Sequence, residues 1–491
     1  MQHFIASLTV CLLSVGMLFG QTTTQLTGKI TNPAGENVTI SFRQGEFDTD
    51  RHQEQADLKA DGTFAMSFDL AKATTATFSH GQERATFYLM PGKAQHLTID
   101  PNEFDESLAF TGEGAAPSNY LVQRFLTFED GAARMEPIQH LRTDTPDDFV
   151  AYSAESMEKK LAFLEEFHAS TPLPESFMEG EKSSLKFQQG SSMFRFVQYY
   201  SYRAEKSWEN EDTEDDLPSI GKEYYAFMDE LPLNDDEMVG KASYRAYLDA
   251  FLNHKYSELT NDVPNYNFGN YQADLIQLAG MLFQGKSRDI MRYRQSLSMM
   301  EDGAVGPAGD VLEEFQATKA EEYPALIANL EEAYDRAQKL QVGQPAPPLD
   351  MPGLDGESIQ LSDFKGKVVY VDFWASWCGP CMAEVPSAKK LKEAFKDEKD
   401  VVFLYISIDD DESAWRKAIE DKQIEGVHAW SQGWQSQAPV KYSVRGIPRY
   451  YLINRDGTIA NNSAPRPSSG ETLRNEIRTA LKGSADGGNS K

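Results

Sequence analysis

Two cysteines three residues apart carry the main chemistry that this sequence offers: Cys378 and Cys381, in the stretch FWASWCGPC. A structural zinc site needs four ligands, usually from two such pairs, and the chain has no second CxxC. Met382 stands where a haem-attachment motif has histidine. A disulfide across so small a loop restricts the unfolded chain little, so stabilisation is a poor reason for the pair. The pattern therefore favours electron exchange with another disulfide.

The sequence on either side predicts that the pair lies where a strand turns into a helix. KVVYVDFW (367–374) is a nearly continuous β-forming run, typical of a buried central strand, and residues 382–398 have helical periodicity. We expect Cys378 at the helix N-terminus, where unpaired N–H groups and the positive end of the dipole stabilise a thiolate. That thiolate would attack a disulfide, and Cys381, one turn on, would resolve the mixed disulfide.

The third cysteine, Cys11, lies in an apolar run of 16 residues from Phe4 to Phe19, before the polar QTTTQ. Such a run is short for a membrane span and typical of a secretory signal. We expect residues 1–20 to be a cleaved signal peptide and the mature protein to work in the periplasm or cell envelope; an uncleaved membrane anchor is the alternative. The net charge of −29 argues against nucleic acid as a partner, because nothing offsets the repulsion of phosphates.

The rest of the chain divides into regions of different composition. Residues 21–112 hold short alternating runs such as NVTISFR and GTFAMSFDL between turn sequences, which predicts a small antiparallel β-sandwich or barrel. Residues 120–340 have helical periodicity, with a break expected at Pro324. A Pro/Gly-rich linker opens a compact domain over 341–485, and 486–491 form a flexible tail. The predicted fold class is multidomain: an antiparallel β-domain, a central all-α region and a C-terminal α/β domain.

Three stretches of the central region carry predictions of their own, and two of them have an alternative interpretation. Apolar residues at helical spacing predict one buried helix face: Val150, Met157, Leu161, Leu164 and Phe167. FRFVQYYSY (194–202) predicts a buried helix with two exposed tyrosine tips, with a peptide groove as the alternative. ENEDTEDD (209–216) predicts a solvated loop rather than a calcium site, because the regular ligand spacing and turn glycine of calcium loops are missing.

Residues 342–485 resemble the thioredoxin superfamily and, within it, the exported TlpA/ResA-like thiol–disulfide oxidoreductases of bacteria. FWASWCGPC is thioredoxin-like almost letter for letter. GQPAPPLDMPGLDGESIQLSDFKGKVV (343–369) resembles the lead-in of that subgroup and of related redoxins, and RGIPRYYLINRDGTI (445–459) resembles the segment that carries a cis-proline. The resemblance implies a thioredoxin fold for the C-terminal domain.

The resemblance also implies roles for single residues. Cys378 would be the attacking thiol and Cys381 the resolving thiol, joined in the oxidised state by a redox-active disulfide. Pro386 matches the proline that kinks the active-site helix. The residues expected to contact the substrate, with Pro448 as the cis-proline, are Trp377, Gly379, Pro380, Ile447 and Pro448. Trp430 or Trp434 could border the same surface, with hydrophobic packing as the alternative.

Two acids stand at positions where the family carries a proton for the resolving cysteine. Asp372 matches the buried carboxylate of thioredoxins, and Glu384 matches the acid of the TlpA/ResA-like branch. A carboxyl group buried among apolar side chains has a raised pKa and can exchange a proton near neutral pH. An unpaired acid in a central strand is costly, which favours function for Asp372. For Glu384, solvation at the surface is the alternative.

The sequence therefore predicts an exported protein-disulfide reductase. Its partners would be a disulfide-bearing protein and a membrane protein that re-reduces the Cys378–Cys381 disulfide, and it would need no organic cofactor and no metal. One alternative is a client- or envelope-binding protein whose redox domain is accessory. Another is a disulfide oxidase or isomerase. Peroxide reduction is not expected, because peroxiredoxins place a single peroxidatic cysteine in a different loop.

Overall fold

The computed structural model describes residues 22–483 apart from 46, 48–49, 82, 210–218 and 261–270. The chain divides into two compact units, Met1–Lys255 and Tyr256–Lys491. The expected signal peptide, the acidic segment beyond residue 209 and the expected tail lie outside the described residues. Within the described ranges, no helix has both the length and the apolar character needed to cross a membrane.

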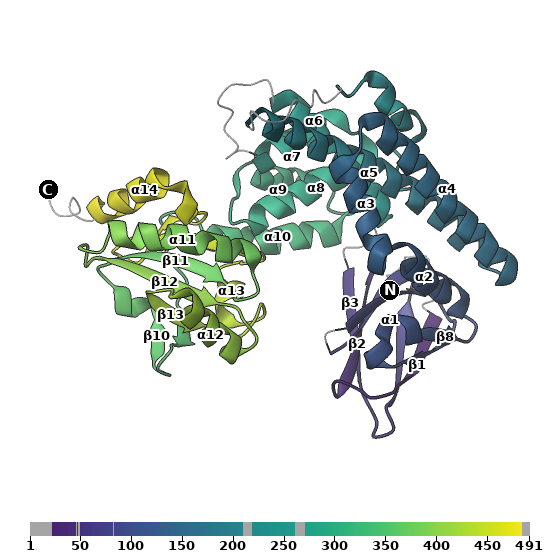
Figure 1. Ribbon diagram of the computed structural model, residues 1–491, viewed down its shortest axis with the longest axis horizontal. Coiled ribbons are helices and arrows are strands. Elements are labelled where there is room, and N and C mark those ends of the chain that lie inside the picture. Colours follow the sequence, from purple (N-terminus) through teal and green to yellow (C-terminus); the bar gives the residue numbers. More distant parts are fainter. Residues whose placement is uncertain are drawn as a thin grey trace, which may run out of the picture. The chain divides into compact units, whose positions relative to one another are not determined.

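The first unit begins with two four-stranded sheets (Figure 1). One has the order β4 (Thr63–Leu70), β1 (Thr22–Ile30), β7 (Gln95–Ile99), β8 (Ala109–Thr111). The other has the order β3 (Asp50–Asp57), β2 (Asn37–Gln44), β5 (Thr74–His80), β6 (Glu83–Leu89). Apolar side chains from both sheets form one buried cluster, including Leu26, Ile40, Phe78 and Leu97. The pairing is antiparallel except between β1 and β7, which run parallel.

The middle of the chain is helical, as predicted. After the short α1 (Phe104–Ser107), the helices of the first half are α2 (Ala115–Phe128), α3 (Gly131–Thr143), α4 (Pro146–Ser170), α5 (Glu175–Glu209) and α6 (Ala242–Thr260). Those of the second half are α7 (Tyr271–Leu282), α8 (Gly285–Glu301), α9 (Gly306–Thr318) and α10 (Pro324–Lys339). The predicted break at Pro324 is confirmed, since α10 begins there, where a missing N–H costs nothing.

Two of the helical predictions can be compared with the structure residue by residue. On α4, Leu164 and Phe167 are buried, but Val150 is 39% exposed, so the predicted face is wrong at its N-terminal end. On α5, Phe194 and Phe196 are fully buried and Tyr199 is 45% exposed. The predicted buried helix is confirmed, and Tyr199 is one of the exposed tyrosines expected, whereas Tyr200 is buried.

The C-terminal α/β domain is built on a five-stranded sheet, with the order β13 (Val427–Trp430), β12 (Val401–Ser407), β11 (Val368–Trp374), β14 (Arg449–Ile453), β15 (Ile459–Asn461). Every residue of β11 is buried, because the strand lies in the middle of the sheet and both faces are covered. One face packs against α11 (Gly379–Ala394), α12 (Glu412–Lys422) and α14 (Glu471–Lys482), and α11 and α14 lie together in Figure 1. Strand β11 is therefore buried along its whole length, and residues 375–378 connect it to α11.

The other face of this sheet is covered by α13 (Gln437–Lys441) and by the segment that leads into the domain. That segment carries a two-stranded sheet of β9 (Asp350–Pro352) and β10 (Ser358–Gln360). Leu340, directly after α10, is 1% exposed and belongs to the same core cluster as Val371 and Phe373 of β11. The last helix of the central region thus continues into the core of the α/β domain.

Candidate active site

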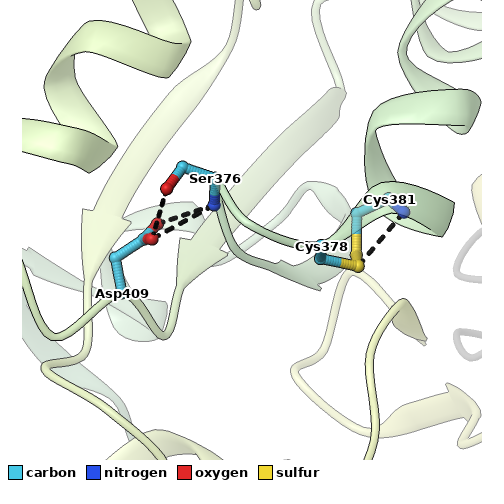
Figure 2. Close-up of a disulfide and its surroundings, with 4 residues drawn as sticks. All are labelled: Ser376, Cys378, Cys381 and Asp409. Atoms are coloured by element: carbon cyan, nitrogen blue, oxygen red, sulfur yellow. Dashed lines mark hydrogen bonds between the residues drawn. A yellow bond between two sulfur atoms is a disulfide. The ribbon is translucent and has the colours of Figure 1, made fainter. Parts of the chain in front are cut away.

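The two cysteines lie at the junction of β11 and α11. Cys378 is the N-cap residue of α11, and Pro380 occupies its first turn. The sulfur atoms of Cys378 and Cys381 are joined in a disulfide, with 5.3 Å between the two Cα atoms. Figure 2 shows the pair at the start of the helix. The predicted strand-to-helix position of the CxxC motif is confirmed.

The helix N-terminus provides Cys378 with a hydrogen-bond donor. The backbone N–H of Cys381 donates to Cys378 Sγ at 3.1 Å (Figure 2). In the reduced protein the same N–H group and the positive end of the helix dipole would favour the thiolate at this position. Both sulfur-bearing residues are largely buried, Cys378 being 4% exposed. Cys381, at 5% exposed, is buried to the same degree, so the helix N-terminus rather than exposure singles out Cys378 as the nucleophilic thiol.

Exposed residues surround the buried pair. Trp377 is 59% exposed, and Gly379 and Pro380 are exposed as well. A side chain added to Gly379 would meet no other atom within 4 Å, so packing does not explain the glycine. The Trp377 ring lies 6.4 Å from that of Trp434, centroid to centroid, whereas Trp430 is stacked on Trp415. Of the two tryptophans predicted as alternatives, Trp434 is the one beside the exposed rim.

The loop after α13 brings Ile447 and Pro448 to the same region. The Ile447–Pro448 peptide bond is cis. Ile447 packs against the core cluster that contains Cys378 and Cys381. The residues that the sequence assigned to substrate contact therefore come from two separate segments, the turn before α11 and the loop before β14.

Asp372 is buried in the middle of β11. Burial, followed by the negative charge of Glu384, raises the pKa of its carboxyl group from 3.8 to about 8. Its Oδ1 has no hydrogen-bond partner among the described residues. With a pKa in this range, Asp372 can both give and take a proton near neutral pH.

Glu384, on α11, is buried as well and is not solvated at the surface. Its two carboxylate oxygens accept hydrogen bonds from Ser468, one from the backbone N–H at 2.9 Å and one from the hydroxyl at 2.8 Å. Ser468 lies in a short 3-10 turn, Pro467–Ser469, before α14. The carboxylate is held by neutral donors, and its charge acts on Asp372.

The sequence did not identify Asp409 or Ser468. Asp409, two residues after β12, is 1% exposed and accepts hydrogen bonds from the backbone N–H and the hydroxyl of Ser376, which Figure 2 shows, and from the hydroxyl of Ser407 at 2.7 Å. It anchors the turn that leads to Cys378. The run of four acids after a buried strand, Asp409 to Glu412, was the available signal, but nothing in it distinguishes Asp409 from its exposed neighbour Asp410.

In the described part of the chain, no group of three His, Cys, Asp or Glu side chains is placed to hold a metal ion. His428 is buried against the ring of Tyr405, and one of its ring nitrogens lies 2.8 Å from the carbonyl oxygen of Ile424. Burial lowers the pKa of His428, which favours the neutral imidazole.

Comparisons with known proteins find matches to the C-terminal α/β domain. The family model described as Redoxin matches residues 341–479. A thiol-disulfide oxidoreductase ResA of Bacillus cereus is 33% identical, in a match that covers 25% of this chain and 69% of the relative. The thioredoxin-like protein YneN of Bacillus subtilis is 30% identical, in a match that covers 27% of this chain and 76% of the relative. A solved structure titled as a putative thiol-disulfide oxidoreductase from Bacteroides vulgatus is 38% identical, with a TM-score of 0.27, over 29% of this chain and 99% of its own.

Proposed function

The chain belongs, through its C-terminal domain, to the ResA-like thiol–disulfide oxidoreductases of the thioredoxin superfamily, and from that premise we propose that it reduces disulfides in proteins outside the cytoplasm. The observation that carries the proposal is Cys378 at the N-cap of α11, with the N–H of Cys381 donating to its sulfur. The Gly379–Pro380 dipeptide, which resembles that of reducing thioredoxins, supports the direction.

The reaction transfers two electrons from the reduced enzyme to the substrate. The Cys378 thiolate attacks one sulfur of the substrate disulfide, so a mixed disulfide forms and the other substrate sulfur leaves as a thiolate that takes up a proton. Cys381 then loses its proton and attacks Cys378 Sγ. The mixed disulfide breaks, the second substrate sulfur leaves as a thiol, and the Cys378–Cys381 disulfide remains.

The proton of Cys381 needs an acceptor in a buried site. Asp372, with its pKa of about 8, is partly ionised near neutral pH and suits this role. Glu384, held by Ser468, would tune Asp372 through its charge or take the proton itself. We assign the proton relay to these two acids together, since their charges interact.

The cycle closes when another protein reduces the Cys378–Cys381 disulfide. We assign this step to a membrane electron donor and place the enzyme in the periplasm or cell envelope, because the apolar run Phe4–Phe19 is typical of an export signal. Trp377, Gly379, Pro380, Ile447 and Pro448 are the proposed contacts for the substrate chain.

The reduction potential of the Cys378–Cys381 pair tests the direction. We expect equilibration of the full chain with glutathione to give a value close to that of thioredoxin, about −270 mV. A value close to that of strong oxidants such as DsbA, about −120 mV, would contradict a reductase and favour an oxidase or isomerase. The Cys378→Ser variant, which cannot form the disulfide, is the control for the signal.

A further inference from the structure

The turn between α8 and α9, residues 301–305, contacts the α/β domain at the loop that carries the proposed substrate contacts. Arg445 Nη1 lies 2.6 Å from Glu301 Oε1. Arg449 Nη2 donates to the backbone carbonyl of Asp302 at 2.8 Å. The two arginines bracket the Ile447–Pro448 peptide in the sequence, so the loop is attached to the helical turn on both sides.

A third attachment comes from the hairpin next to that loop. Asn462 Nδ2 donates to the carbonyl of Gly303 at 2.7 Å and to the carbonyl of Leu340 at 3.0 Å. The same Arg449 Nη2 that reaches the helical turn also donates to the carbonyl of Asn462 at 2.8 Å. We call this set of contacts the clasp: Glu301, Asp302 and Gly303 on the helical side, and Arg445, Arg449 and Asn462 on the redox side.

The helical side of the clasp is itself fixed. Gly303 has a positive φ of 83°, which a glycine adopts without strain, and its N–H closes the end of α8 on the carbonyl of Met300. Gln272, from α7, donates to Asp302 Oδ2 at 2.6 Å, and Gln341 donates to the carbonyl of Gly303, also at 2.6 Å. Two helices and the start of the redox domain therefore hold this turn in place.

The contacts of the clasp differ in strength. The Arg445–Glu301 ion pair is partly exposed, with 57% of the arginine side chain accessible, so solvent screens it. The hydrogen bonds that Asn462 donates to Gly303 and Leu340 are partly buried, whereas the one that Arg449 donates to Asp302 is exposed. Water replaces a lost donor more easily at an exposed carbonyl than at a buried one. We therefore expect Asn462 to contribute more to the clasp than Arg445 or Arg449 does.

The clasped loop and the reacting sulfurs share one hydrophobic core. Ile447 packs against the core cluster that contains Cys378 and Cys381. A protein substrate would have to lie along this loop to present its disulfide to Cys378, whereas a small disulfide needs only access to the sulfur. The position of the loop should consequently matter for large substrates and much less for small ones.

We propose that the clasp holds the Ile447–Pro448 loop in the position that captures a protein disulfide, so that the α8–α9 turn of the helical region supplies positioning residues to the redox site. This inference rests on the proposed function. It assigns the helical region a direct part in substrate binding.

The test uses the full chain, reduced with dithiothreitol, and two substrates: insulin and glutathione disulfide. Asn462→Asp removes both donated hydrogen bonds and sets a carboxylate against two carbonyls. Glu301→Arg sets two cations together, and the double variant Glu301→Arg/Arg445→Glu restores the pair. The matched controls are Asn454→Asp, in the same hairpin, and Glu314→Arg, which removes the ion pair with Arg292 elsewhere between α8 and α9.

For Asn462→Asp we expect the KM for insulin to rise about tenfold, the effect of losing hydrogen bonds worth one decade in affinity. The value of kcat, the rate with glutathione disulfide and the reduction potential should change less than twofold. Glu301→Arg should raise the KM for insulin about threefold, and the double variant should restore it. The two control variants should behave as the wild type.

Unchanged KM for insulin in both clasp variants would overturn the inference. An equal loss for both substrates would overturn it too, because the clasp would then support only the stability of the domain. A wild-type chain that reduces neither substrate would contradict the proposed function itself. The wild type alone gives this result, so the two failures can be told apart.

Discussion

Buried acids have different partners in the helical region and in the redox domain. In the helical region, Glu181 is paired with Arg124 and accepts a hydrogen bond from the hydroxyl of Tyr120 at 3.2 Å. Asp289, which is 2% exposed, lies 3.1 Å from the ammonium of Lys319. Each of these two buried carboxylates has a cation beside it, which is the arrangement that stability requires.

In the redox domain, neither buried acid of the proposed relay pairs with a cation among the residues that the structure describes. Asp372 makes no ion pair with a described residue, and Glu384 is held only by the neutral donors of Ser468. A buried acid without a cation keeps its proton to a higher pH and lowers the stability of the folded protein when it ionises. The contrast suggests that the acids of the helical region serve the fold and that Asp372 serves proton transfer.

The largest expected effect is that of the Asp372→Asn substitution on the pH dependence of stability. The pKa of Asp372 is about 8 in the folded protein and 3.8 is its ordinary value, so the folded chain keeps a proton that the unfolded chain has lost. Wild-type stability should therefore fall between pH 4 and pH 8, by about 4 kcal/mol by pH 7 at 1.36 kcal/mol per unit. The asparagine variant should lose this slope and be more stable than wild type at pH 7, as urea unfolding at several pH values would show.

The same variant should slow the resolving step. Loss of a positioned proton acceptor typically costs about 100-fold in rate, and stopped-flow measurement of substrate release from the mixed disulfide would detect it. If the variant kept the wild-type rate and the wild-type dependence of stability on pH, Asp372 would be a structural acid like Glu181 and Asp289.

The Arg124→Met substitution should lower the stability of the protein and leave its redox activity unchanged. It leaves Glu181 buried with only a tyrosine hydroxyl, and breaking such a pair costs about 3 kcal/mol. The rate with glutathione disulfide should not change. The matched control is Arg336→Met, because the Arg336–Glu332 pair is largely exposed on one helix and should contribute close to nothing. Equal losses of stability from the two variants, measured by urea unfolding, would show that burial does not distinguish these pairs.

The smallest effect concerns the coupling between the two acids. The charge of Glu384 is the second cause of the raised pKa of Asp372, after burial. Glu384→Gln should lower that pKa and leave it above its ordinary value, because burial, the larger cause, remains. Carboxyl NMR titration would measure the change. Ser468→Ala, which keeps the carboxyl group of Glu384, is the control, and an unchanged Asp372 pKa in Glu384→Gln would show that the charge of Glu384 does not act on Asp372.

The redox centre was predictable because its signals are local in the sequence. The apolar run before Cys378 and the helical periodicity after Cys381 place the pair at a helix N-terminus without any long-range information. Ser468 and Asn462 come from segments far along the chain from Glu384 and Gly303, and no local pattern links them. These hydrogen bonds can be found only in the three-dimensional fold, which also brings the α8–α9 turn to the Ile447–Pro448 loop.

The β-domain shows the same limit. The strand β3, DRHQEQAD, was not predicted, because its polar residues show no alternation of apolar and polar positions. It lies at the edge of its sheet, paired only with β2, and can therefore form with few apolar side chains. The strands that were predicted, such as β2 and β4, bury an alternating apolar face.

The burial of Leu340 affects how the protein can be divided. A fragment that begins at the Pro/Gly-rich linker would lack this side chain, which fills the core behind β11, and the carbonyl to which Asn462 donates. The redox domain is therefore not an interchangeable module that ends at its sequence boundary. Excision or fusion to another protein should keep α10, and an ancestor that gained or lost the front region would have had to repack this face of the sheet.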